Sequence, residues 1–96
     1  MRIIWSPLSI DRITEIAKYI SEEDRSAVVE LVNHLFSRVE PLSNFPESGQ
    51  AVPELNRTDI RQLVDGSYRI IYRVGADDIS ILTVRHHRQH LSEEDI

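Results

Sequence analysis

The sequence contains no cysteine, which excludes disulfides, thiolate nucleophiles and cysteine-ligated metal sites. No apolar run approaches the roughly 18 residues that cross a bilayer. The first residues, Met-Arg-Ile-Ile-Trp-Ser-Pro, lack the long apolar segment and small-residue cleavage site of a signal peptide. We therefore expect a cytoplasmic protein with no membrane partner. A chain of 96 residues, 41% of them hydrophobic and 28% charged, forms one small domain with a modest core.

Lysine is nearly absent, because Lys18 is the only lysine among eleven basic residues. The net charge of −5 would oppose binding to a polyanion if it were evenly spread. Residues 55–88, however, carry six arginines against four aspartates (+2), and the rest of the chain carries five basic against twelve acidic residues (−7). The planar fork of arginine suits carboxylate or phosphate. This region therefore favours recognition of an anion, although the same arginines could simply solvate a sheet face.

Three runs rich in Ile, Val, Leu and Tyr lie between residues 59 and 88, and turn signals at 65–67 and 75–78 separate them. Side chains of a strand alternate between its faces. One face of the middle run is apolar or aromatic, and the other carries two guanidiniums around an isoleucine: Tyr68, Ile70, Tyr72 and Val74 against Arg69, Ile71 and Arg73. We expect strands 68–74 and 79–85 to pair antiparallel, in a sheet that packs helices on one face and displays Arg and His on the other.

The N-terminal third has the pattern of one strand and two helices. Residues 2–5 form a short apolar run, and Ser6-Pro7 is a strong helix start signal. Apolar residues then recur at helical spacing over about 7–20 and again over 25–39, where Pro41 ends the pattern. The short connection predicts an antiparallel helical hairpin.

The element order strand, helix, helix and three strands predicts an α+β fold, with the helical hairpin on one face of a mainly antiparallel sheet. The proline- and glycine-containing stretch 42–55 is expected to be a loop. We expect a single domain over residues 1–91, followed by a frayed acidic tail at 92–96.

An ordered set of short motifs resembles the toxins of the RelE/ParE superfamily. The motifs are Trp5-Ser6-Pro7, residues 45–55 (FPESGQAVPEL), 60–63 (IRQL), 68–74 (YRIIYRV) and 84–88 (VRHHR). The resemblance covers the chain from about Ile3 to Leu91 in the same element order. It implies a bacterial type II toxin that forms a hetero-oligomer with a cognate antitoxin protein and uses no cofactor.

The superfamily divides by target, and the resemblance implies different site residues for each branch. RelE-like members cleave messenger RNA, usually in the ribosome, which requires a base, an acid and cations on the phosphate. For that branch the resemblance places the phosphate-binding arginine at Arg69 and a second catalytic residue at His87 or Arg88, with His86 beside them. ParE-like members poison DNA gyrase and have no hydrolytic site. The candidate anion-binding residues in either case are Arg61, Arg69, Arg73, Arg85 and Arg88.

Three departures from the RelE-like pattern favour a ParE-like gyrase poison. No aromatic residue follows Leu91, whereas RelE-like enzymes often stack a C-terminal tyrosine on a base. The strand beginning at 60–62 carries arginine in place of the usual lysine, and the chain is acidic. A ribosome-dependent endonuclease is the alternative, supported by 86–88, and a non-toxic domain that binds only the antitoxin is a third.

The adjacent histidines His86 and His87 are candidates for acid–base catalysis, since the ordinary histidine pKa of about 6.5 suits neutral pH. Neighbouring residues of a strand point to opposite faces, so we expect these two not to share a metal ion. The sequence predicts no metal site. Trp5 and Tyr72 are expected in the core.

Overall fold

The computed structural model describes residues 1–22 and 24–96. Within them, one five-stranded sheet has the strand order β1-β5-β4-β3-β2. The elements are β1 (Arg2–Trp5), α1 (Pro7–Ser21), α2 (Arg25–Val39), the 3₁₀ turn η1 (Glu40–Ser43), β2 (Gln50–Ala51), β3 (Ile60–Asp65), β4 (Tyr68–Val74), β5 (Asp78–His86) and the 3₁₀ turn η2 (Glu93–Asp95). β1 runs parallel to β5, and the other pairings are antiparallel. The predicted α+β class is confirmed.

Both helices begin at side-chain caps, and the sequence indicated the first of them at Ser6. Ser6 Oγ accepts a hydrogen bond from the Ser9 N–H at 3.0 Å, and Pro7 occupies the first helical turn. The Ser6 hydroxyl also donates to the Leu82 carbonyl at 2.8 Å, which fixes the start of α1 against β5. Asp24 caps α2 by accepting from the Ser26 N–H at 2.9 Å. The Ser26 hydroxyl also donates to this carboxylate at 2.7 Å, and the hydroxyl bond, followed by the N–H bond, lowers the pKa of the Asp24 carboxyl.

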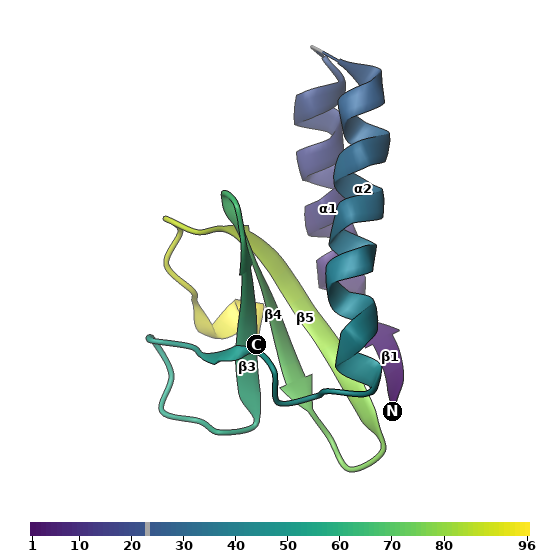
Figure 1. The fold of residues 1–96 in the computed structure, drawn as a ribbon. Coiled ribbons are helices and arrows are strands. Elements are labelled where there is room, and N and C mark those ends of the chain that lie inside the picture. The colour runs from purple at the N-terminus through teal and green to yellow at the C-terminus, as the bar shows by residue number, and fades with distance from the viewer. Residues whose placement is uncertain (23) are drawn as a thin grey trace.

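The main core lies between the helical hairpin and one face of the sheet. Figure 1 shows α1 and α2 side by side on the same side of the strands, as predicted. Leu35 and Val39 of α2 pack there against the apolar face of β4. All four residues assigned to that face belong to this cluster: Tyr68, Ile70, Tyr72 and Val74. The pairing of β4 with β5 confirms the predicted hairpin.

The opposite face of the sheet carries a second, smaller core, so our expectation of an open face was wrong. Val52, Ile60, Ile71 and Leu91 are buried there, with Leu55 and Leu82 packed against them. The connection before β3 and the chain after β5 supply apolar side chains that cover this face. Figure 1 shows the C-terminal segment lying on the side of the sheet away from the helices.

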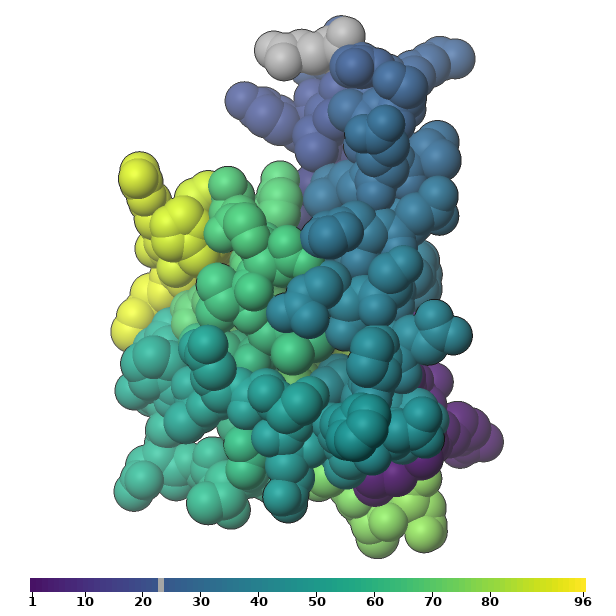
Figure 2. Space-filling view, viewed as in Figure 1, coloured from purple at the N-terminus to yellow at the C-terminus, as the bar shows by residue number. Residues whose placement is uncertain are grey.

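Two further local expectations are corrected. The stretch 42–55 is not loop throughout, because η1 continues directly from α2 and Gln50–Ala51 pairs with β3 as an edge strand. The tail 92–96 is not frayed, because Asp95 is buried and forms a capping box with Ser92. The Ser92 N–H donates to Asp95 Oδ2 at 3.0 Å. In Figure 2 the yellow C-terminal residues lie against the green strands, while the C-terminal end of α1 and the N-terminal end of α2 project beyond the sheet.

Candidate functional site

Arg69 lies on β4 beneath the chain segments that cover the second face, and only 5% of its surface is exposed. Its Nη1 donates to Glu54 Oε1 at 2.9 Å and to Gln62 Oε1 at 3.1 Å. Its Nη2 bonds to Glu54 Oε2 and donates to the Gln89 carbonyl at 2.8 Å. The guanidinium therefore links the connection before β3, β3 itself and the segment after β5. Its terminal nitrogens are fully used by hydrogen bonds within the chain.

Glu54 is the carboxylate partner in this buried pair. Besides the two bonds from Arg69, its Oε2 accepts from the Leu91 N–H at 3.0 Å. The hydrogen bond from Arg69 lowers the Glu54 pKa from 4.5 to about 2, against an opposing contribution from burial. The pair also raises the already high pKa of Arg69. Both groups are thus charged throughout the physiological pH range.

The depressed pKa of Glu54 makes the pair sensitive to acid. Its contribution to folding is complete above the unfolded pKa of about 4.5 and is lost as the pH falls toward about 2. We expect that contribution to be on the order of 3 kcal/mol. Urea unfolding of the natural chain and of Glu54→Gln should show a stability difference that shrinks between pH 5 and pH 2. A difference that stays constant over this range contradicts the prediction.

Arg85 is the neighbour of Arg69 across the β4–β5 pairing and shares its face of the sheet. Its Nη1 lies 3.6 Å from Asp95 Oδ1, and Arg12 Nη2 on α1 lies 3.9 Å from the same oxygen. Arg85 Nη2 also lies 3.5 Å from the His90 carbonyl oxygen. Two cations thus converge on a carboxylate supplied by the C-terminal turn.

His86 and His87 do not point to opposite faces, and that expectation was wrong. Their rings stack with centroids 4.7 Å apart and planes inclined by 26°. β5 ends at His86, and the chain turns back so that the Gln89 N–H reaches the His86 carbonyl at 2.9 Å. Strand alternation no longer applies at His87, whose Nδ1 lies 3.1 Å from the Ser67 carbonyl oxygen. Among residues 1–22 and 24–96, no group of three or more His, Cys, Asp or Glu side chains could hold a metal ion.

The remaining candidate arginines are scattered. Arg61 Nη1 donates to the carbonyls of Gly49 at 3.1 Å and Glu47 at 3.3 Å, so it is partly committed to the chain. Arg73 and Arg88 are exposed, and neither forms an ion pair within the described part of the chain. The structure therefore brings Arg69 and Arg85 together and leaves the other three at separate places.

The candidate catalytic residues lie on different sides of the sheet. His86 pairs with Tyr68 across the β4–β5 register, and therefore points to the helix side, whereas Arg69 points to the covered side. The Arg88 N–H lies 3.3 Å from His86 Nδ1, which places the start of the turn beside the imidazole. Sequence reasoning missed Glu54, Arg12 and Asp95 altogether. No spacing or motif connects them with the strand arginines they contact.

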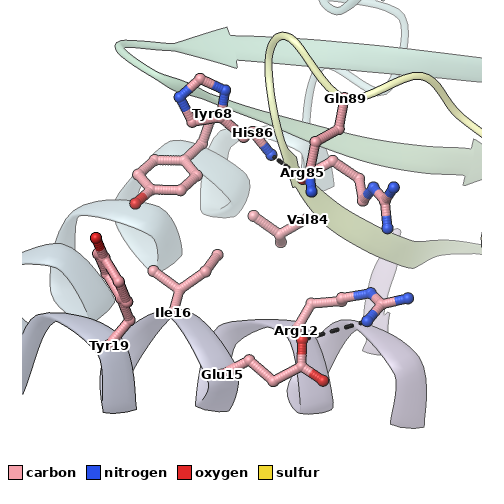
Figure 3. Close-up of a pocket in the computed structure, with 9 residues that line it drawn as sticks. All are labelled: Arg12, Glu15, Ile16, Tyr19, Tyr68, Val84, Arg85, His86 and Gln89. Carbon is pink, nitrogen blue, oxygen red and sulfur yellow. Dashed lines mark hydrogen bonds and ion pairs between the residues drawn. The ribbon is translucent and has the colours of Figure 1, made fainter.

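A pocket of about 440 Å³ opens between α1 and the ends of β4 and β5. Figure 3 shows apolar and aromatic side chains along its middle and the long side chains of Arg12 and Arg85 reaching toward the same end. Its lining residues are Arg12, Glu15, Ile16, Tyr19, Tyr68, Val84, Arg85, His86 and Gln89. The pocket thus combines an apolar middle with two cations and one carboxylate, since Arg12 Nη1 donates to Glu15 Oε2 at 3.2 Å.

Comparison with known proteins connects this fold to a family. Residues 3–91 match the family described as "ParE toxin of type II toxin-antitoxin system, parDE". The chain belongs to the ParE toxin family. A relative in Sinorhizobium fredii, described as a candidate toxin and named Y4kP, is 34% identical over 88 residues, which cover 92% of this chain and 90% of the relative.

Two solved structures share the fold of this ParE-family chain. The "Chromosomal ParDE TA system from P. aeruginosa" superposes with a TM-score of 0.73 at 19% identity, over 90% of this chain and 95% of the other. A YoeB dimer from Staphylococcus aureus superposes with a TM-score of 0.53 at 22% identity, over 91% and 97%. The family establishes a type II toxin of the RelE/ParE superfamily, which confirms the resemblance drawn from the sequence. In the residues described, no helix is both long and apolar enough to cross a membrane.

Proposed function

We propose that this ParE-family toxin inhibits growth by binding and poisoning DNA gyrase, and that a cognate antitoxin silences it in a hetero-oligomer. It would act in the cytoplasm, without a cofactor and without hydrolytic chemistry of its own. The observation that carries this proposal is that the Arg69 guanidinium is already hydrogen-bonded within the chain. A guanidinium whose two terminal nitrogens already bond to Glu54, Gln62 and the Gln89 carbonyl has no free donor pair for a phosphate.

The arrangement of the other candidates supports binding over RNA cleavage. General acid–base cleavage needs the base, the acid and the cation within hydrogen-bond reach of one reacting phosphate. His86 lies on the helix side of β5, whereas Arg69 and Arg85 lie on the covered side. The net charge of −5 also repels a dense polyanion such as the ribosome.

A RelE-like messenger RNA endonuclease is the second candidate, and one observation favours it. The stacked rings of His86 and His87 and the exposed Arg88 form a group of titratable and cationic side chains at the end of β5. Such a group could hold a phosphate and move a proton. A domain that binds the antitoxin without toxicity is the third candidate, and assays of gyrase and of ribosome-bound message would then both be negative.

We expect purified toxin to inhibit supercoiling by gyrase and to increase the fraction of cleaved DNA, because a poison stabilises the broken intermediate. Messenger RNA in translating ribosomes should remain intact in primer-extension assays. New messenger RNA ends within ribosome-bound codons, together with unchanged gyrase activity, would reverse the assignment to the endonuclease.

Exposed arginines provide the variants for the gyrase assay. Arg73→Gln and Arg88→Gln remove charges that the fold does not use, so each should weaken association by a modest factor, about 2- to 10-fold. Because only binding is affected, raising the toxin concentration should restore inhibition. Arg25→Gln removes an exposed charge at the start of α2, away from β4 and β5, and serves as the matched control.

A further inference from the structure

The C-terminal segment consists of two parts that are held in different ways. The first part is anchored: Leu91 is buried in the second core, its N–H donates to Glu54 at 3.0 Å, and the Gln89 carbonyl accepts from Arg69 at 2.8 Å. These bonds are short and involve charged partners, so they are strong. The second part, residues 92–96, depends on Asp95.

Asp95 is buried, with only 2% of its surface exposed. In the part of the chain that the structure describes, its Oδ1 atom nevertheless accepts no hydrogen bond. Asp95 Oδ1 lies 3.6 Å from Arg85 Nη1 and 3.9 Å from Arg12 Nη2. Both distances exceed the range of a hydrogen bond, whereas charge-assisted bonds between nitrogen and oxygen are about 2.7–2.9 Å long. Within the described residues, Asp95 Oδ1 and the Nε atoms of Arg12 and Arg85 are buried without a hydrogen-bond partner. Charge attraction places the carboxylate here, but the Nε donor of each arginine remains unsatisfied.

We propose that Arg12 and Arg85 form an oxyanion-binding site and that residues 92–96 are a lid that fills this site with the chain's own Asp95. Unsatisfied buried donors carry a free-energy cost that a better-fitting anion would remove. A ligand that bonds to both guanidiniums at normal distances therefore competes with Asp95. The lid can leave while Leu91 and Gln89 stay anchored, because the bonds of Leu91 and Gln89 go to Glu54 and Arg69, whereas Asp95 lies against Arg12 and Arg85. Arg85 also contacts the anchored part, but its Nη2 lies 3.5 Å from the His90 carbonyl, at the limit of a hydrogen bond.

The ligand that fits best is a carboxylate on an amphipathic peptide. The present occupant of the site is itself a peptide carboxylate. The adjoining pocket is lined along its middle by Ile16, Val84 and Tyr68, which suit an apolar side chain better than a sugar–phosphate backbone (Figure 3). The proposal concerns access to this site and holds whichever target the toxin has.

Asp95→Asn is the variant that opens the lid with least disturbance. The asparagine side chain can still accept from the Ser92 N–H, so the C-terminal turn is retained, but the charge that attracts Arg12 and Arg85 is removed. The probe is an acetylated peptide with the sequence of residues 91–96, followed through the Nε–H NMR signals of Arg12 and Arg85. A tethered group competes at millimolar effective concentration, so we expect the variant to bind this peptide about tenfold more tightly than the natural chain.

The matched control is Glu94→Gln, which removes one negative charge from an exposed residue of the same turn. It should bind the peptide as weakly as the natural chain. Equal gains in Asp95→Asn and Glu94→Gln would show that net charge alone is responsible, and would overturn the proposal. Binding that survives in Asp95→Asn combined with Arg85→Gln would also overturn it. In a second arm, inorganic phosphate that binds Asp95→Asn more tightly than the peptide would reject the peptide carboxylate as the preferred ligand.

Amide hydrogen exchange gives an independent readout in a chain that keeps Asp95. In Arg85→Gln, the Asp95 N–H, which bonds to the Ser92 carbonyl at 3.0 Å, should exchange about tenfold faster than in the natural chain. The Leu91 N–H should keep its protection, since its bond to Glu54 is unaffected. Loss of protection at both amides would show that the segment moves as one unit, which would contradict the two-part lid.

Discussion

Replacing Arg69 by methionine is expected to lower the free energy of unfolding by about 3–5 kcal/mol. The change leaves Glu54 charged and without its main partner, in a site where only 12% of its side chain is exposed. It also removes the donor to the Gln89 carbonyl, which loosens the C-terminal segment. Urea unfolding at pH 7 measures the effect directly.

The double variant Arg69→Met with Glu54→Gln separates the cost of an unpaired charge from the value of the pair. Removing both charges should recover most of the lost stability, because a buried pair often contributes little over neutral side chains of similar size. Arg73→Met, on the same strand but exposed, should change stability by no more than about 0.5 kcal/mol. An Arg69→Met variant as stable as Arg73→Met would show that the buried pair is not what holds the second face together.

The structural role of Arg69 also affects how toxicity assays are interpreted. If Arg69 is structural, its replacement reduces every activity of the toxin in proportion to the folded fraction. A residue that contacts only a scissile phosphate would instead reduce cleavage while leaving the unfolding transition unchanged. Measuring stability and toxicity on the same variants therefore distinguishes the two roles of Arg69.

Gly49→Ala is expected to destabilise the chain on the order of 3 kcal/mol. A Cβ atom at this position would lie 2.7 Å from Cε1 of Tyr72 and 2.8 Å from the backbone oxygen of Gln62. Tyr72 is fully buried, and the Gly49 N–H donates to its hydroxyl at 2.9 Å. Neither contact can relax by rotating an exposed side chain, so the connection before β3 must shift. Thermal and urea unfolding both report the loss.

Gly66→Ala is the matched control for this glycine. Gly66 has a φ of 56°, and a Cβ there would meet no heavy atom within 4 Å. Its replacement costs only the left-handed backbone conformation, about 1–2 kcal/mol. Gly66→Ala should therefore lower the free energy of unfolding less than Gly49→Ala does. If it lowers it more, the steric cost expected at Gly49 is wrong, and backbone conformation matters more to stability than the close packing of Gly49 on Tyr72.

The sequence alone determined the elements of this protein and their order. Helix limits at Pro7 and Val39 follow from capping serine and terminating proline, which act within a few residues of the helix ends. The alternation along β4 correctly assigned Tyr72 to the main core, because side-chain direction in a strand depends only on position. Ordered motifs over residues 3–91 were sufficient to identify the superfamily.

Only the tertiary structure shows which arginines are exposed and which are buried in ion pairs. Arg69 and Arg73 are equivalent in the sequence pattern, yet one is buried by Glu54 and the other is exposed. Glu54 lies in an irregular connection, where no periodicity predicts which strand residue its side chain will reach. The fate of a buried charge depends on its partner across the fold, so local pattern could not distinguish the two arginines.

The C-terminal segment shows the same limit. Its acidic composition indicated a solvated tail, because charged residues usually remain exposed. Leu91 and Asp95 are buried nonetheless, since the second core offers an apolar surface and Arg12 and Arg85 offer charge. The apolar surface and the two arginines come from elements far apart in the chain, and only the folded sheet brings them together. Local sequence therefore specified the helices and strands, whereas long-range packing determined which charges the surface of this toxin presents.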